Sequence, residues 1–234
     1  MPTDPPSWVT DLPGLAAQVW ARLVRGVGDR HAAARNPTLA TVSPAGWPEA
    51  RTVVLRAADP VAGTLDIHTD PRSAKVASLQ ANPRAVLHVW DPAAHLQIRA
   101  AVVVQLLTGE AVAAIWARVP DPSRQSYGTM PAPGQPIADA LAYDKRPDAA
   151  SFAVLRCTVQ VFDVLHLGPQ HRRVRLAVDQ RPFRRQLGQL AAQGIAAFPQ
   201  GREALFRFGN GGQALQEAGQ VEQPAVTGGL PGAA

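Results

Sequence analysis

The sequence is poor in several residue types, and each scarcity excludes a class of protein. Its 234 residues include a single cysteine, Cys157, which excludes an internal disulfide and a cysteine-cluster metal site and fits a cytoplasmic protein. No run of apolar residues approaches the roughly 18 that a membrane-spanning helix needs. The N-terminus lacks the basic stretch and apolar run of a secretory signal. We therefore expect a cytoplasmic protein with no membrane partner.

Lysine is also scarce, because only Lys75 and Lys145 stand among the 23 basic residues and the rest are arginines. The net charge of +5 and the isoelectric point near 10.3 suggest an anionic partner. The basic residues are not interleaved with aromatic ones, as a groove for single-stranded nucleic acid requires. We expect no nucleic-acid partner, and phosphate binding by a few defined cations is the more economical use of the charge.

Hydrophobic residues make up 46% of the sequence, which is enough for a core. They recur with a helical period in one segment and with a strand period in the rest. Leu15, Val19, Leu23 and Val27 recur every four residues and predict an amphipathic helix over 11–30. After it the period becomes twofold, with many β-branched residues. This pattern predicts strands at 38–43, 49–57, 63–69, 84–91, 95–107, 151–167 and 171–178.

The short connections between these strands predict the fold class. Turns at 44–47 and 91–94 join successive strands as hairpins, whereas a parallel sheet needs a long crossover, usually a helix, between strands. The prediction is therefore a mainly β protein with flanking helices, whose antiparallel sheet closes into a barrel. Trp47 and Trp90 are expected in its core or at an interface.

The remaining segments complete the predicted organisation. A helix is expected at 109–120, and the Pro-, Asp-, Ala- and Gly-rich stretch 119–149 reads as a functional loop. We expect an N-terminal helical extension over 1–34, a barrel domain over 35–178 and a C-terminal extension over 179–234 that loses order toward its end.

The stretch "LDIHTDPRSAKVASLQANP", residues 65–83, is the first candidate binding element. Asp70 as N-cap and Pro71 as first helical residue predict a helix start, with Ser73 in its first turn. A phosphate placed there meets free backbone N–H groups, the Ser73 hydroxyl and the Lys75 ammonium. The alternative is an ordinary capped helix on which Ser73 and Lys75 are merely solvated.

The second candidate is "RTVVLR", whose two arginines are placed on opposite faces of one predicted strand. An arginine on an apolar face needs an anionic partner, and either a carboxylate or a phosphate can serve. The third is "QIR", in which Gln97 and Arg99 share the polar face of their strand. An amide and a guanidinium side by side suit a polar heterocycle, or form a solvated edge.

The four motifs R-x-V-V-L-R, H-T-D-x-x-S-x-K, A-V-L-H-V-W and Q-I-R follow one another in this order. Together they resemble the flavin-binding core of the pyridoxamine 5'-phosphate oxidase family, over about residues 35–130. The resemblance implies an FMN-binding split β-barrel and a homodimer with FMN in the clefts between the subunits.

The resemblance also implies which residues contact FMN. Arg51, Ser73 and Lys75 are expected to bind the phosphate, and the backbone of Val53 to Leu55 to line the ring. His68 and Thr69 stand where the family has an aromatic–Thr pair. The implied contacts are Arg51, Thr52, Val53, Val54, Leu55, Arg56, His68, Thr69, Ser73, Lys75 and Gln97, with Gln125 and Ser126 contributed by the partner subunit.

Departures from the family pattern concern one ligand of the FMN phosphate, at Ala74, and the substrate end. Ala74 stands where the family often has an arginine. In "HRRVRL", Arg172 matches the first residue of the family's Arg-x-His-x-Arg run, but Val174 replaces its histidine, and no tryptophan follows Trp116. Arg172 and Tyr127 are the expected substrate contacts.

The function implied by the resemblance is FMN-dependent oxidoreduction of a small molecule, of the oxidase type. The alternatives are a flavin- or haem-binding module without turnover, and a reductase that uses nicotinamide or a deazaflavin. No metal site is expected, and no side chain stands out as a catalytic base.

Overall fold

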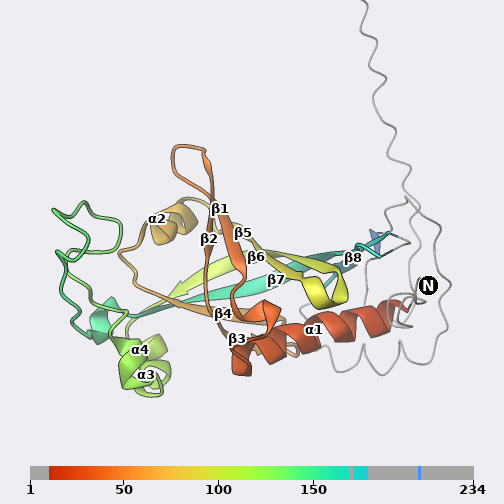
Figure 1. Ribbon diagram of the computed structural model, residues 1–234, viewed down its shortest axis with the longest axis horizontal. Helices are drawn as coiled ribbons and strands as arrows, with labels where there is room; N and C mark the ends of the chain where they lie inside the picture. The colour runs from red at the N-terminus through yellow and green to blue at the C-terminus, as the bar shows by residue number, and fades with distance from the viewer. Residues whose placement is uncertain (1–10, 169–170, 179–204, 207–234) are drawn as a thin grey trace, which may run out of the picture.

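The computed structural model describes residues 11–168, 171–178 and 205–206 (Figure 1). The helices are α1 (Leu12–Gly28), α2 (Ala74–Ala81), α3 (Glu110–Ala117) and α4 (Asp121–Arg124), with short 3₁₀ turns at Ala33–Arg35, Pro92–Ala94 and Ala149–Ser151. The strands are β1 (Thr38–Val42), β2 (Pro48–Thr52), β3 (Leu55–Asp59), β4 (Thr64–Thr69), β5 (Arg84–Asp91), β6 (Leu96–Leu107), β7 (Ala153–His166), β8 (Arg172–Ala177) and β9 (Leu205–Phe206). Apart from β9, the predicted loss of order over 179–234 lies outside the described residues.

The strands form a mainly antiparallel sheet in the order β2-β1-β5-β6-β7-β4-β3, and β8 pairs with the outer half of β7. The two ends of this order, β2 and β3, are consecutive in the chain and are joined only by Val53 and Val54. Because so short a link holds the two edges together, the sheet has to curl round on itself. The predicted antiparallel barrel is confirmed.

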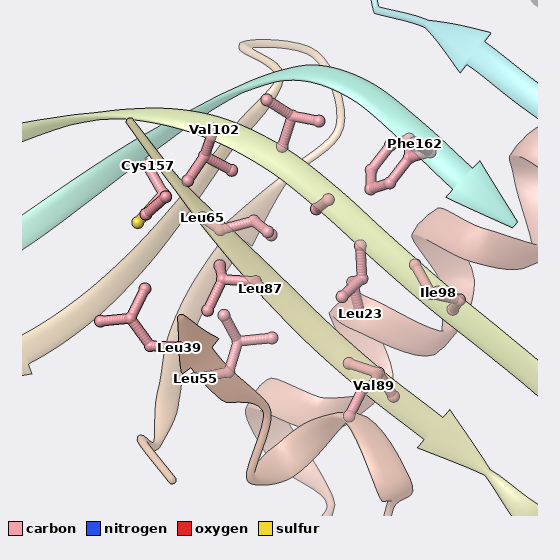
Figure 2. Close-up of a cluster of buried hydrophobic side chains, with 14 of the residues drawn as sticks. Leu23, Leu39, Leu55, Leu65, Leu87, Val89, Ile98, Val102, Cys157 and Phe162 are labelled. Atoms are coloured by element: carbon pink, nitrogen blue, oxygen red, sulfur yellow. The ribbon is translucent and has the colours of Figure 1, made fainter. Parts of the chain in front are cut away.

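The barrel interior is filled by apolar side chains from several of its strands. Figure 2 shows Leu39, Leu55, Leu65 and Leu87 converging from β1, β3, β4 and β5, and all four are buried. β6 alternates buried and exposed residues along most of its length, so one face lines the core and the other meets solvent. Burial of apolar surface is therefore the main force that closes the sheet.

The predicted N-terminal helix is present as α1 and packs against the barrel. Its buried stripe includes Leu15, Val19, Trp20 and Leu23, and the Trp20 ring meets Phe162 of β7 edge-on at 5.2 Å between centroids. Among the residues that the structure describes, no helix is long and apolar enough to span a bilayer.

The predicted strand 49–57 is wrong as a single element. It is divided into β2 and β3, which lie at opposite ends of the sheet order, so alternation within one strand does not set the faces of Arg51 and Arg56. A bulge between Leu55 and Ala57 further redirects Arg56. Sequence periodicity cannot detect this break, because the linking residues Val53 and Val54 are themselves typical of strands.

The predicted helix start at Asp70 is also wrong, by three residues. α2 begins at Ala74, and Ser73 is its N-cap residue. The Asp70 carboxylate instead accepts a bond from the backbone N–H of Arg72 at 2.9 Å and pairs with the Arg72 side chain, which forms a turn before the helix. The predicted stop at Asn82 is confirmed, since Asn82 is the C-cap.

Three further predictions need correction. Trp47 and Trp90 are 73% and 41% exposed, so the core alternative is wrong for both, and the interface alternative stays a prediction. The helix expected over 109–120 is shorter, at Glu110–Ala117. The loop expected from residue 119 begins with the helical turn α4.

Candidate functional site

The end of β4 and the start of α2 bring three polar side chains together. The Lys75 ammonium donates to Thr69 Oγ1 and to Ser73 Oγ, each at 3.0 Å, and these two hydroxyls lie 3.2 Å apart. We call these three residues the Lys75 cluster. Thr69 and Ser73 are buried, and Lys75 is half-buried.

The positive charge of the Lys75 cluster is incompletely compensated. Burial and the neighbouring Arg51 guanidinium hold the pKa of Lys75 below its ordinary value. Among the described residues, no carboxylate forms an ion pair with Lys75, whose two oxygen partners are neutral hydroxyls. A partly desolvated ammonium with only neutral partners favours an anionic ligand.

Arg51 lies beside the Lys75 cluster on β2 and is already partnered. Its guanidinium donates to Thr41 Oγ1 and to Glu49 Oε2, each at 2.6 Å. Glu49 also accepts a bond from the Ser78 hydroxyl of α2 at 3.2 Å. A carboxylate or a phosphate was the expected partner of Arg51, and the structure shows a carboxylate, that of Glu49. Because Glu49 also bonds to Ser78, it connects β2 to α2.

Glu49 and Thr41 are site residues that the sequence reasoning missed. Glu49 precedes Arg51 by two residues on the same strand, so both side chains emerge on one face. This two-residue spacing could have indicated that Glu49 pairs with Arg51. The position of Thr41 was not predictable from spacing, because it depends on the register in which Thr41 pairs with Glu49 across the β1–β2 hairpin.

Two of the four residues between the two arginines face the core. Val53 and Leu55 are buried, so only their backbone can face a ligand, as the resemblance implies. Thr52 is exposed and Val54 is partly buried.

His68 and Arg56 belong to a second group, on the other face of β4. The His68 ring meets Phe152 edge-on at 4.9 Å between centroids, and Phe152 in turn packs on Tyr127 at 5.1 Å. Burial, with a smaller effect of the Arg56 charge, lowers the pKa of His68 to about 4. Burial raises the pKa of Tyr127, and Arg56 opposes this shift. His68 is therefore a neutral imidazole at physiological pH.

Gln97 does not lie near the Lys75 cluster in the same chain. It pairs with Trp90 and Leu165 at the start of β6, whereas the other end of β6, Leu107, pairs with Val154, the residue after the partner of Thr69. From residue 97 to residue 107 a strand rises about 3.3 Å per residue. Gln97 and Leu107 are therefore on the order of 30 Å apart along β6, and Figure 1 shows β6 and β7 extending from the end near α2 toward β8.

The expected substrate contacts are separated in the same way. Arg172 pairs with His166 at the far end of β7, on the Gln97 side of the molecule. Tyr127 is buried against Phe152, which directly precedes the start of β7. Gln125 and Ser126 are exposed at the turn after α4, near Tyr127. In a single chain the expected contacts therefore form two groups, toward the two ends of the β6–β7 pair.

Comparison with known proteins identifies the family of this chain. The family model described as pyridoxamine 5'-phosphate oxidase, FMN-binding domain, matches residues 17–108. A pyridoxamine 5'-phosphate oxidase-related, FMN-binding protein from Nostoc punctiforme PCC 73102 has 30% sequence identity and a TM-score of 0.57, covering 67% of this chain and 87% of its own. No match is found among curated proteins.

Two more distant structures share the fold. One is a protein from Clostridium acetobutylicum related to general stress protein 26, of the pyridoxinephosphate oxidase family, with 11% identity, a TM-score of 0.51 and coverage of 72% of this chain and 97% of its own. The other is PhzG from Burkholderia lata 383 in complex with tetrahydrophenazine-1-carboxylic acid, with 18% identity, a TM-score of 0.54 and coverage of 76% and 91%. The fold is thus that of the FMN-binding split barrels. The chain belongs to the pyridoxamine 5'-phosphate oxidase-related, FMN-binding family.

Proposed function

We propose that this chain binds FMN and acts as an FMN-dependent oxidoreductase on a small molecule. The observation that carries the proposal is the Lys75 ammonium, half-buried beside Arg51, with two hydroxyls and no carboxylate of the described residues as partners. A phosphate supplies the missing negative charge and also accepts bonds from Thr69 and Ser73. The residues present therefore fit the phosphate end of FMN.

Each residue of this site has a distinct part in binding. Lys75 contributes the charge, and Ser73 and Thr69 contribute hydroxyl donors on a rigid turn. Arg51 adds a second positive charge whose orientation is fixed by Glu49 and Thr41. The redox chemistry of such a site comes from the bound FMN, and the protein binds and orients it.

The separation of these two groups of contacts supports a homodimer. Gln97 and Leu107, the end of β6 toward Thr69, are on the order of 30 Å apart along the strand, which exceeds the length of an FMN molecule. We infer that Gln97 contacts the flavin held by the Lys75 cluster of a second copy, and that Arg172 reaches the same site. Each dimer then has two equivalent composite sites.

Binding of FMN and of riboflavin to the purified protein tests the phosphate assignment. Both ligands carry the same ring, but only FMN carries the phosphate. We expect much tighter binding of FMN, measured by quenching of flavin fluorescence. Equal affinities would contradict the assignment of the Lys75 cluster.

Mixed dimers test the composite site. Lys75→Met and Gln97→Ala each impair both sites of a homodimer. In a mixed dimer one site carries both defects and the other carries neither, so mixing the variants restores about one tight FMN site per dimer. If mixing restores no tight binding although subunits exchange, both residues act within one chain and the dimer proposal fails.

A second candidate function is flavin binding without turnover, and one observation favours it. Val174 stands where the family has a histidine, and it packs on the apolar core instead of presenting a polar group. We therefore expect little or no turnover of pyridoxamine 5'-phosphate. Anaerobic reduction of the bound flavin by candidate donors, including reduced nicotinamides, distinguishes the two functions. A donor that reduces it within seconds supports the enzyme, and a panel of inert donors supports the binding protein.

A further inference from the structure

Asp70 lies in the turn between β4 and α2 and contacts the Lys75 cluster through its backbone. Its carbonyl oxygen accepts bonds from the backbone N–H of Ser73 at 3.1 Å and from Ser73 Oγ at 2.8 Å. The Thr69 hydroxyl lies 3.3 Å from the same oxygen. The position of this carbonyl therefore helps to fix both hydroxyls of the cluster.

The carboxylate of Asp70 points to a different part of the chain. Its side chain is only 3% exposed, and it accepts bonds from Arg72 Nε at 3.0 Å and Arg72 Nη2 at 2.6 Å. It also accepts the backbone N–H of Gly128 at 3.4 Å. Burial alone would raise the pKa of Asp70, but the bonds from Arg72 and Gly128 more than offset it and keep the carboxylate charged.

Arg72 extends this contact into the loop of residues 128–148. Its Nη2 donates to the carbonyl of Thr129 at 3.1 Å, and its Nη1 lies 3.3 Å from the Met130 sulfur. The base of the loop is closed by paired backbone bonds between Met130 and Asp144 at 2.9 and 2.8 Å. In Figure 1 the loop (green) projects from the same end of the molecule as α2.

The base of the loop is tightly packed at Gly128, whose N–H donates to Asp70, so a displacement of Gly128 would change the Asp70 contact. Gly128 has φ +103°, and a Cβ at this position would clash with the carbonyl oxygen of Arg146. Between its two ends the loop is exposed, with Leu141 at 81% and Tyr143 at 39%. The loop is thus attached through Asp70 and Arg72 to the turn that carries the Lys75 cluster.

We propose that Asp70 is a positioning residue that couples occupancy of the Lys75 cluster to closure of the 128–148 loop. Opening the base of the loop breaks the Asp70 contacts and loosens the turn that holds Ser73 and Thr69. A phosphate bound at the cluster prefers the ordered turn, so it stabilises the closed loop, and a closed loop strengthens phosphate binding by the same factor. This inference rests on the proposed FMN site.

Limited chymotrypsin digestion tests the coupling, because Leu141 and Tyr143 are cleavage sites within the loop. Cleavage at these positions is followed by mass spectrometry in the full-length protein, with saturating FMN, with riboflavin and without ligand. We expect FMN to slow cleavage by about fivefold or more, the lower end of ordinary coupling between sites. Riboflavin, which lacks the phosphate, gives no protection.

Two variants examine the role of Asp70. Asp70→Asn retains a hydrogen-bond acceptor but loses the two charge-assisted bonds from the Arg72 guanidinium. Arg72→Gln removes the contacts of Arg72 with the loop, and it serves as the test if Asp70→Asn folds poorly. Both are expected to bind FMN more weakly and to lose protection of the loop even at saturation. Asp121→Asn is the matched control, because it removes an exposed Asp–Arg pair, with Arg124, and should keep full protection.

The outcomes separate this inference from the proposed function. If the unaltered protein does not quench FMN fluorescence, the assignment of the phosphate site is wrong and the proposed coupling fails with it. If FMN binds but leaves the cleavage rate at Leu141 and Tyr143 unchanged, only the coupling is wrong. Full protection in both the Asp70 and Arg72 variants at saturating FMN likewise overturns the role of Asp70.

Discussion

Replacement of Lys75 by methionine should change FMN affinity and the stability of the ligand-free protein in opposite directions. In the ligand-free chain the ammonium is half-buried and next to Arg51, and its only bonds to residues that the structure describes are to two hydroxyls at 3.0 Å. Burial and the Arg51 charge lower its pKa, so the fold disfavours the charged form. Methionine has a similar length and no charge, so this cost is removed.

The magnitude follows from the bonds that a phosphate would make. A hydrogen bond to a charged group contributes about 1.5–3 kcal/mol, which corresponds to roughly a tenfold to hundredfold loss of FMN affinity in Lys75→Met. The free energy of unfolding without ligand should rise or stay within about 0.5 kcal/mol of the unaltered protein. An ordinary structural residue shows the reverse, with stability lost and affinity little changed.

The assay is fluorescence titration with FMN at two salt concentrations, together with urea unfolding of the ligand-free protein. Arg25→Met is the control, because Arg25 is a 72% exposed cation on α1, outside the predicted site. General electrostatic attraction fades with salt, whereas a structured contact largely persists. Equal loss of affinity in the two variants, or a large loss of stability in Lys75→Met, would refute the reasoning.

Three further predictions concern the fold around the site. Burial and the Arg56 charge lower the pKa of His68 in the folded protein from 6.5 to about 4. Between these two pH values His68 is therefore protonated in the unfolded chain and neutral in the folded one. Stability should therefore fall by about 3 kcal/mol as the pH drops through this window, and His68→Phe should remove that part of the loss. Gly26→Ala should destabilise by about 1–3 kcal/mol, since its Cβ would lie 2.6 Å from the Ala34 backbone. Arg35→Ala should cost about 1.5–3 kcal/mol, because its guanidinium donates to a carbonyl near the end of α1 at 2.6 Å.

Matched controls exist for each of these variants, with urea unfolding as the common measurement. His31→Phe changes an exposed histidine and should keep the pH dependence. Gly28→Ala adds a methyl group with nothing within 4 Å and should not destabilise. Arg30→Ala removes an exposed arginine and should be near neutral. A control as harmful as its paired variant would contradict the corresponding structural reason.

Most helices and strands could be predicted from the sequence, because they depend on the spacing of apolar residues along the chain. The fourfold spacing in α1 and the twofold alternation in β6 each reflect one apolar face against a core. The predicted phosphate residues Thr69, Ser73 and Lys75 are brought together by the chain itself, since they lie within seven consecutive residues around one turn. Local geometry therefore decides this part of the site.

The tertiary structure alone decided the features that depend on register and on contacts distant in sequence. The break at Val53 and Val54 follows from closing the barrel, and β propensity is the same on both sides of it. The contact between Asp70 and Gly128 joins residues far apart in the chain, which no spacing rule links.

The same distinction explains the placement of Gln97. Its motif predicted a polar side chain on the open face of a strand, and β6 confirms that. Motif order suggested one continuous site with Lys75, whereas the register of β6 with β7 and of β7 with β4 places the two at opposite ends of the sheet. The sequence by itself determined the chemistry of each group of contacts, because side-chain type and local spacing are sufficient for that. Their separation was decided only by strand pairing, because register determines which residues meet across a sheet.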